Sequence, residues 1–447
     1  MTQAENIDAV PVLALGRLSG VDSGFAGVKG ANLGELLFAG LPVPPGFVVG
    51  TPALAALLDQ GGLRKRLESL LREADLADAQ AAARVASRAR ALVLDQPLPA
   101  ATNEQVREAY FELTAATAEH TVAVRSSPSR LDPPSASFAG MGDTFLGVRG
   151  GDQLLRAVQG CLASVFAPRS VAYRARQRMD PTEARMAVVV QQQLPATSAG
   201  VLWTLDPTSG SLARVVVEAT FGLGSAVVSG SVRPDRHVVD KHTLSVLSRE
   251  VHPKEVAIEA TPEGGTFVRG LPPPEASKAA LTDAQTIELA QLGCRIERHY
   301  GAPQEVEWLL TANGRASILQ SRSVSAAGVS PEIDPVPTSV LVRGFPAAPG
   351  TRRGRVAMPP SPTADEAMRD GDVLVLDATT PEWDGLIARS AGVITEGGGM
   401  AAHAAVVARA LGLPCVTGAA GATRRLRAGQ PVVVDGTHGY VIRAPGR

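Results

Sequence analysis

The feature that most constrains this chain is a segment near its C-terminal end, where three consecutive glycines separate an apolar run from a helix-forming stretch. The apolar run at 392–394 predicts a buried strand. The glycines at 397–399 let the backbone turn sharply and approach another group closely. An Ala/Val-rich helix is expected from about Ala401 to Gly412, with Pro414 just beyond as a stop signal. This order of elements predicts a compact α/β module at this end of the chain.

His403 falls in the first turn of the expected helix. Backbone N–H groups there have no partner within the helix, and the helix dipole is positive at this end, so the position is an anion site. A neutral imidazole in such a place can attack a phosphoryl group, and the same N–H groups would stabilise the phosphohistidine. The alternative is an ordinary polar residue at a helix start; the glycines and small residues around His403 favour the chemical interpretation.

The segment 394–409 resembles the phosphohistidine motif of the PEP-utilising swivelling domain of PEP synthase, pyruvate phosphate dikinase and rifampin phosphotransferase, and the similarity continues to residue 436. In that family the histidine carries a phosphoryl group from one active site to another. The resemblance therefore implies that His403 is phosphorylated. The family usually has a Thr or Ser hydroxyl just before the histidine, where this chain has Ala401 and Ala402.

Composition limits the remaining possibilities. The 447 residues are enough for roughly two or three domains. Lys+Arg 43 against Asp+Glu 44 leaves a net charge of −1, so no overall field favours nucleic acid or an acidic membrane. Cys161, Cys294 and Cys415 lie far apart and form no CxxC pair, which predicts a reduced, cytoplasmic setting. The sequence also lacks a signal-peptide pattern and any long apolar run, so we expect neither secretion nor a membrane span.

A second chemical signal lies near the N-terminus, where Gly27 and Gly30 flank Lys29 ahead of a short helix expected to end at Gly40. A lysine in a glycine-rich bend reaches phosphate oxygens as a point charge, although an exposed surface lysine would give the same pattern. The spacing is not that of a Walker A motif. The segment resembles the opening of the family's nucleotide-binding domain, an ATP-grasp fold, which implies that Lys29 contacts the phosphates of ATP.

A third signal is the apolar strand expected at 121–124, which ends in Arg125 and is followed by a loop of small residues at 135–146. A guanidinium holds phosphate oxygens at two points, and such a loop can donate backbone N–H groups to them; a structural salt bridge is the alternative for Arg125. The resemblance implies that Arg125 and Gly140, within this loop, bind the triphosphate. The family's acidic pair in this region reads Leu131-Asp132 here.

Three short apolar runs predict buried strands at 186–192, 199–205 and 215–219. The resemblance implies that the first lines the adenine pocket, with Gln191 near its end, and that Glu218 on the third belongs to the nucleotide site. In the glycine-rich turn that follows, Ser225 stands where the family usually has Glu.

Two further strands are expected at 303–308 and 316–322, joined by an Asn-Gly turn and preceded by a helix at 283–300. Pairing of the strands would bring Glu307 and Gln320 together, and a carboxylate plus an amide oxygen suits Mg²⁺ bound to a triphosphate. Arg322 points to the same face as Gln320 and can stabilise charge on the transferred group. A surface strand residue is the alternative for Glu307. The resemblance implies that all three positions bind metal and phosphates.

The predicted fold class is α/β and α+β, a two-part ATP-grasp domain followed by a small swivelling phosphohistidine domain. The expected parts are an N-terminal subdomain at 1–185, a C-terminal subdomain at 186–323, a linker at 324–339 and the phosphohistidine domain at 340–447. The linker is rich in proline and therefore semi-rigid. About 15 extended residues reach at most roughly 50 Å, enough for a domain to travel between sites.

The sequence therefore predicts an ATP-dependent phosphotransferase, a kinase or dikinase with paired acceptors, that uses ATP and Mg²⁺. The resemblance implies that His403 takes a phosphoryl group with the help of Arg322 and Arg125, with release of AMP and phosphate. The family's PEP/pyruvate barrel and rifampin-binding domain have no expected counterpart, so the acceptor is a small molecule or is bound by a separate subunit. The alternatives are an ATP-grasp ligase or kinase that does not use the histidine, and a non-catalytic regulatory subunit. Leu131, Ser225 and the two alanines before the histidine would support the last.

Overall fold

The computed structural model describes residues 11–74, 79–115, 120–129, 142–168, 170–171, 174, 185–261, 263–324 and 340–444. The chain forms two compact units. The first comprises residues 1–194 with 260–267 and 318–320, and the second comprises 195–259, 268–317 and 321–447. Among the described residues, none of the helices combines the length and the apolar character that crossing a bilayer requires.

The first unit is built on a five-stranded sheet in the order β1-β2-β5-β3-β4. Its strands are β1 (Val12–Ala14), β2 (Gly46–Val49), β3 (Thr121–Pro128), β4 (Thr144–Arg149) and β5 (Met186–Gln192). Each neighbouring pair is antiparallel. Every residue of the central strand β5 is buried. The continuous apolar run that predicted this strand is typical of a strand covered on both faces.

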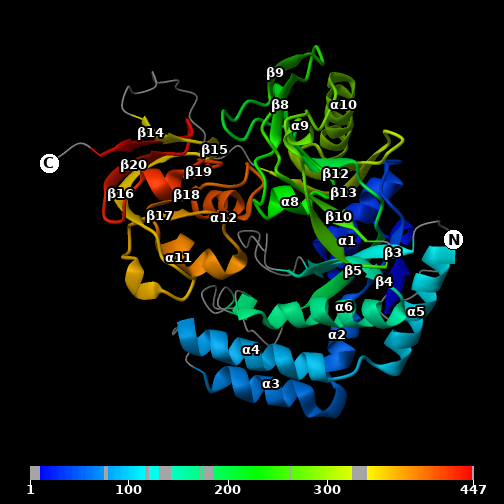
Figure 1. Cartoon of the computed structure of the whole chain (residues 1–447). Helices are drawn as coiled ribbons and strands as arrows, with labels where there is room; N and C mark the ends of the chain where they lie inside the picture. Colours follow the sequence, from blue (N-terminus) through cyan, green and yellow to red (C-terminus); the bar gives the residue numbers. More distant parts are fainter. Residues whose placement is uncertain are drawn as a thin grey trace. The chain divides into compact units, whose positions relative to one another are not determined.

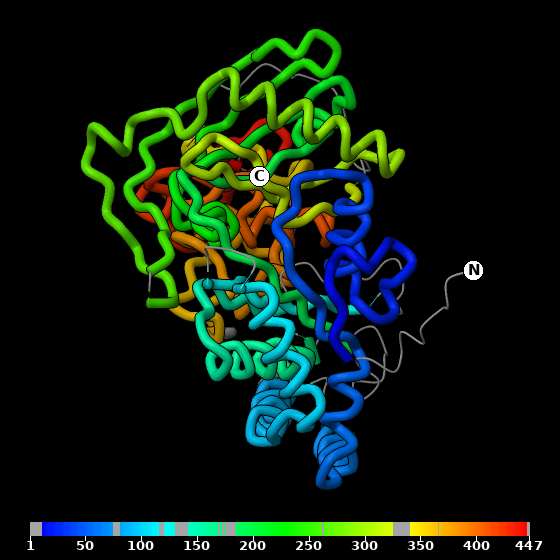
Figure 2. Tube along the Cα trace, turned by 90° about the vertical axis from the view of Figure 1, so that its right-hand side faces the viewer, coloured from blue at the N-terminus to red at the C-terminus, as the bar shows by residue number. Residues whose placement is uncertain are grey.

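The described residues of this unit include the helices α1 (Ser23–Phe38), α2 (Thr51–Leu58), α3 (Leu63–Arg72), α4 (Ala79–Asp95), α5 (Ala100–Ala115) and α6 (Gly151–Ala163). In α3 the buried residues Leu63, Leu67 and Leu71 recur every four positions and so lie on one face. Helices α3 and α4 lie side by side, as both views show (Figures 1 and 2).

The glycine-rich segment around Lys29 differs from the expectation. Lys29 lies inside α1, not in a bend before a helix. The bend is at Gly27, whose φ of 65° interrupts the helix. A Cβ on Gly27 would lie 2.1 Å from the carbonyl oxygen of Ser127, so only glycine allows α1 to approach β3 this closely.

The N-terminal part of the second unit contains a six-stranded sheet in the order β13-β12-β6-β7-β8-β9. Its strands are β6 (Ser198–Trp203), β7 (Arg214–Phe221), β8 (Asp235–Asp240), β9 (Val246–Glu250), β12 (Gln304–Leu310) and β13 (Ala316–Ser323). Helix α10 (Asp283–Tyr300) packs against β6, β7, β8 and β12 and confirms the helix predicted at 283–300. Smaller elements are α8 (Ser225–Val228), α9 (Pro273–Ala276) and the pair β10 (Val256–Ala260) and β11 (Thr266–Gly270).

The C-terminal part of the second unit has an eight-stranded mixed sheet in the order β14-β21-β20-β16-β17-β18-β19-β15. The strands are β14 (Val340–Arg343), β15 (Phe345–Ala348), β16 (Thr351–Ala357), β17 (Val373–Leu376), β18 (Gly392–Thr395), β19 (Cys415–Thr417), β20 (Pro431–Asp435) and β21 (Tyr440–Arg443). The consecutive pairs from β16 to β19 are parallel. This is the α/β module that the sequence predicts.

Helices cover both faces of that sheet. Helices α11 (Asp384–Arg389) and α12 (His403–Leu411) share one apolar cluster, which includes Val393 of β18 (Figure 1). The next residue, Ile394, faces a different cluster with α13 (Ala422–Arg425). Successive strand residues point to opposite faces, so β18 is buried on both sides. The strand ends at Thr395, two residues before the first of the three glycines. The mixed α/β fold class predicted from the sequence is confirmed for the described residues.

Candidate functional site

Helix α12 begins at His403, two residues later than predicted. The preceding residue, Ala402, is the N-cap and provides no side-chain hydrogen bond. At the other end Gly412 has a φ of 64° and ends the helix as predicted. His403 is thus the first helical residue, at the end where backbone N–H groups and the helix dipole favour a negative charge.

Two side chains flank the imidazole of His403. Its Nδ1 lies 3.1 Å from the hydroxyl oxygen of Thr379, within hydrogen-bond distance. Its Nε2 lies 3.1 Å from Oδ1 of Asp384, but the two atoms do not have the geometry of a hydrogen bond. Sequence analysis missed both residues, although they fall in or directly after the segment 379–383, which resembles a loop of the same family. Ala401 and Ala402, just before the histidine, have no hydroxyl, and the hydroxyl near the ring comes from Thr379.

The three glycines before the histidine have different functions. We call residues 396–402, between β18 and α12, the histidine loop. Gly398 has a φ of 89°, which favours glycine. A Cβ on Gly397 would lie 2.4 Å from the carbonyl oxygen of Gly230, and one on Gly399 would lie 2.6 Å from Oε1 of Glu218. One glycine therefore makes the turn, and two allow the loop to come close to the segment around β7 and α8.

Glu218 of β7 is fully buried and binds the histidine loop. Its Oε1 accepts a hydrogen bond from the backbone N–H of Met400 at 2.7 Å, and its Oε2 accepts one from Ala401 at 3.3 Å. Burial raises the pKa of Glu218 to about 7, against the opposing effect of these two N–H groups and of the positive charges on Arg236 and Arg409. The contact of Glu218 with a nucleotide stays a prediction, because here its carboxylate binds the loop.

Arg322, predicted to stabilise charge on the transferred group, is paired with Glu305. Its Nη2 and Nε lie 2.6 Å and 2.8 Å from Oε1 of Glu305, and Trp203 donates from Nε1 to the other oxygen at 2.8 Å. Burial alone would raise the pKa of Glu305, but Arg322, Arg409 and these hydrogen bonds together hold it below the ordinary value. Sequence analysis missed Glu305. Its position two residues before Glu307, on the same face of the strand, was the available signal.

The first unit brings Lys29 to the end of β3. The Nζ atom of Lys29 donates to the carbonyl oxygen of Ser126 at 3.1 Å, and its backbone N–H donates to Oγ of Ser127 at 3.1 Å. In the same strand Arg125 directs Nη1 to the carbonyl oxygen of Leu319 at 3.4 Å. Two cationic residues thus come from the neighbouring elements α1 and β3, and their contact with phosphates stays a prediction.

Two other predicted nucleotide-binding positions are Gly140 and Gln191. Gly140 lies outside the described residues. Gln191 is buried, and its side chain donates from Nε2 to the carbonyl oxygen of Pro44 at 3.2 Å. Its backbone lies between β2 and β3, opposite Gly46 and Ala123. A role of Gln191 at an adenine pocket therefore stays a prediction.

The predicted metal ligands lie on neighbouring strands, Glu307 on β12 and Gln320 on β13. Within the described part of the chain, no group of three or more His, Cys, Asp or Glu side chains forms a preformed metal centre. The donors present, one carboxylate and one amide oxygen, fit a magnesium ion that takes its other ligands from phosphates and water.

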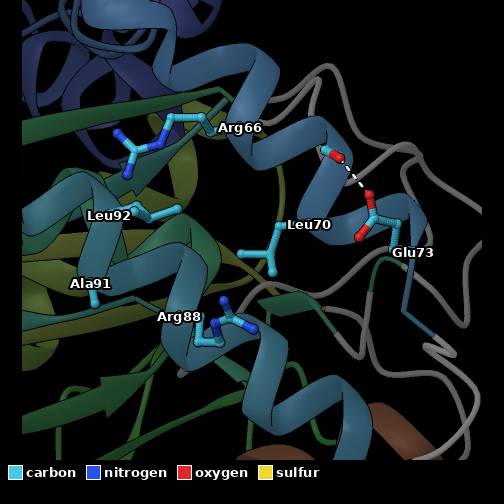
Figure 3. A pocket seen from close by; sticks show the side chains of 7 residues that line it. Arg66, Leu70, Glu73, Arg88, Ala91 and Leu92 are labelled. Carbon is cyan, nitrogen blue, oxygen red and sulfur yellow. Dashed lines mark hydrogen bonds between the residues drawn. The ribbon is translucent and has the colours of Figure 1, made fainter.

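A cavity of about 530 Å³ lies between α3 and α4 (Figure 3). Its lining consists of Arg66, Ser69, Leu70, Glu73, Arg88, Ala91 and Leu92. The Ser69 hydroxyl donates a hydrogen bond to Oε1 of Glu73 at 2.6 Å. None of the predicted site residues lines this cavity, so it is separate from the chemistry considered above.

Comparison with protein families gives two matches. The model described as "Pyruvate phosphate dikinase, AMP/ATP-binding domain" matches residues 23–334. The model described as "PEP-utilising enzyme, mobile domain" matches residues 368–439. Lys29 and Arg322 fall within the first match, and His403 falls within the second.

Curated proteins similar to the chain carry related names. A "Probable phosphoenolpyruvate synthase" of Methanothermobacter thermautotrophicus is 38% identical over 423 residues, which are 94% of this chain and 61% of the relative. One of Archaeoglobus fulgidus is 37% identical over 97% of this chain and 58% of the relative. The "Phosphoenolpyruvate synthase" of Pyrococcus furiosus is 34% identical over 95% and 58%. The chain thus spans about three fifths of the length of these relatives.

Proposed function

Because the chain belongs to the family of pyruvate phosphate dikinase and phosphoenolpyruvate synthase, we propose that it is an ATP-dependent phosphotransferase that carries a phosphoryl group on His403. The observation that carries the proposal is the position of this imidazole. It lies at the first residue of α12, and its Nδ1 is within hydrogen-bond distance of Thr379. A nucleophile is activated when a neighbouring group fixes its orientation and protonation.

The contacts of the imidazole assign a role to each nitrogen. When Nδ1–H donates to the Thr379 hydroxyl, the lone pair lies on Nε2. Nε2 is then the nucleophile, and the helix N-terminus stabilises the phosphoryl group that it receives. In the other tautomer Nε2 carries the proton and faces the Asp384 carboxylate. A hydroxyl can accept from Nδ1–H or donate to a bare Nδ1, so Thr379 orients the ring in either tautomer. Asp384 faces Nε2, the nitrogen that must be deprotonated to attack.

In the proposed nucleotide site, cations hold the phosphates of ATP. Lys29, Arg125 and Gly140 bind the phosphates. Arg322 stabilises charge on the transferred group, and Gln191 lines the adenine pocket. Mg²⁺, held by Glu307 and Gln320, would neutralise charge on the phosphate oxygens. The proposed domain boundaries stay those of the sequence, with a linker at 324–339.

We propose that the transfer begins at the β-phosphorus of ATP. A bond forms between Nε2 of His403 and that phosphorus, the bond to the oxygen of AMP breaks, and AMP leaves. Hydrolysis then removes the γ-phosphoryl group as phosphate, and a single phosphoryl group stays on the histidine. The names of the relatives concern phosphoenolpyruvate, so pyruvate is the first acceptor to test. An acceptor bound by a partner subunit is the second case to test.

The test uses ATP labelled at the β or the γ position, with chromatography of the nucleotides and of the acid-labile protein phosphate. We expect β-label on the wild-type protein, AMP as the product, and no label on His403→Ala. His242→Ala, which changes an exposed histidine, is the matched control. Undiminished productive ATP consumption by His403→Ala would overturn the proposal. ADP without protein label would favour a ligase or kinase that does not use the histidine, and failure to bind Mg-ATP would favour a regulatory subunit.

A further inference from the structure

The buried carboxylate of Glu218 makes two hydrogen bonds that the nucleotide contact expected from the sequence does not explain. It is completely buried in β7, and both of its oxygens accept hydrogen bonds from consecutive backbone N–H groups of the histidine loop, at Met400 and Ala401. A buried carboxylate is costly unless its oxygens have donors. The N–H groups of Met400 and Ala401, three and two residues before His403, are these donors.

The loop is shaped to fit this carboxylate. A Cβ on Gly399 would lie 2.6 Å from Oε1 and 2.8 Å from Oε2 of Glu218, distances that real Cβ atoms do not adopt. The same Cβ would lie 2.6 Å from the ring of Pro234. Glycine at this position is therefore required for the contact, independently of any turn in the backbone.

Apolar packing surrounds the polar contact. Met400 and Ala401 belong to one buried cluster with side chains of the β6–β8 region, namely Val201, Trp203, Val216, Ala226, Val227, Val232 and Val238. On the other side of the loop, the Thr417 hydroxyl donates to the carbonyl oxygen of Gly399 at 3.0 Å. The loop is thus held from both sides, and the Glu218 side chain contributes the buried hydrogen-bond acceptor.

We infer that Glu218 is a positioning residue that anchors the histidine loop on β7, so that His403 is presented in a fixed orientation when its domain receives the phosphoryl group. The inference rests on the proposed function. It differs from the sequence-based role of Glu218, because the carboxylate binds protein N–H groups and not the nucleotide. Removing an acceptor leaves a buried backbone N–H without its hydrogen bond, so the change measurably lowers the fraction of molecules in which the loop is bound to β7.

Two variants test the contact from its two sides. Glu218→Gln keeps the shape but presents one amide NH₂ to a backbone N–H, so only one of the two hydrogen bonds remains. Gly399→Ala places a methyl group against the carboxylate. The matched controls are Glu288→Gln, on the exposed side of α10, and Gly385→Ala, where an added Cβ meets nothing within 4 Å. Melting curves are the check that each of the four variants folds.

The readout is amide hydrogen exchange of Met400 and Ala401, together with ATP affinity and the rate of His403 labelling. We expect both test variants to exchange about 10-fold faster at these amides and to label about 10-fold more slowly, with ATP affinity unchanged. Unchanged exchange in both would overturn the inference, as would a loss of ATP affinity that accounts for the slower labelling. If the wild-type protein is not labelled at all, the proposed function fails, while the exchange experiment still decides whether Glu218 anchors the loop.

Discussion

At the scale of single residues, we expect the contact between Thr379 and His403 to orient the ring, because Ala401 and Ala402 before the histidine carry no hydroxyl. Replacing Thr379 with Val keeps the shape of the side chain and removes the hydrogen bond to Nδ1. A neutral hydrogen bond contributes about 1 kcal/mol, so we expect His403 labelling to slow by about 5- to 10-fold. Thr379→Ser keeps the hydroxyl and should stay near the wild-type rate. Equal rates for the Val and Ser variants would show that the hydroxyl does not orient the ring.

The same contacts explain what the sequence could and could not predict. The place of His403 follows from a local pattern of strand, glycines and small residues, and it was predicted to within two residues of the helix start. Thr379, 24 residues away, and the contact of Glu218 with Met400, 182 residues away, depend on tertiary packing. No local periodicity encodes such distances. Glu305 was missed because a strand pattern does not reveal which acid pairs with Arg322.

At the scale of elements, the histidine loop and β7 form a pH-sensitive contact. Burial raises the pKa of Glu218 from 4.5 to about 7 in the bound state, despite Arg236 of β8 and Arg409 of α12. When the loop leaves, water reaches the carboxylate and its pKa falls toward the ordinary value. The bound state therefore takes up a proton, so its stability is fully present below the ordinary pKa and is lost as the pH rises through about 7.

We therefore expect the protection of the Met400 and Ala401 amides to decrease between about pH 5 and pH 7, after correction for the intrinsic rate of exchange. Glu218→Gln has no titrating group at this position and should remove the dependence. Protection that increases with pH in the wild-type protein would contradict the sign. A dependence that persists in Glu218→Gln would assign it to another group.

The elements also show where local rules hold and where they do not. Helix α10 matches its predicted bounds because Thr282 and Gln285 form a capping box at one end and Gly301, with a φ of 65°, ends the other. The bend near Lys29 was misplaced because a glycine can serve close approach within an interrupted helix. Glycine spacing alone does not distinguish a loop that binds phosphate from a helix that packs tightly on a strand.

At the scale of the whole molecule, the proposed relay requires one chain to provide both a nucleotide site and a carrier histidine. The sequence places about 15 residues between the two proposed parts. A short linker gives the two parts that it joins an effective concentration of about millimolar with respect to each other. Transfer within one chain should therefore be about 1,000-fold faster than transfer between separate chains at micromolar concentration.

Two variants that are each inactive for different reasons test this expectation. Lys29→Ala removes a proposed phosphate contact and keeps the histidine, whereas His403→Ala keeps the nucleotide site and removes the carrier. If transfer occurs within one chain, a mixture of the two at about 1 µM stays unlabelled on the time scale in which the wild-type protein is labelled fully. Rapid labelling of the Lys29→Ala chain in the mixture would mean that the nucleotide site of one molecule serves the histidine of another. The relay would then operate in an assembly of chains, and the linker would not set its rate.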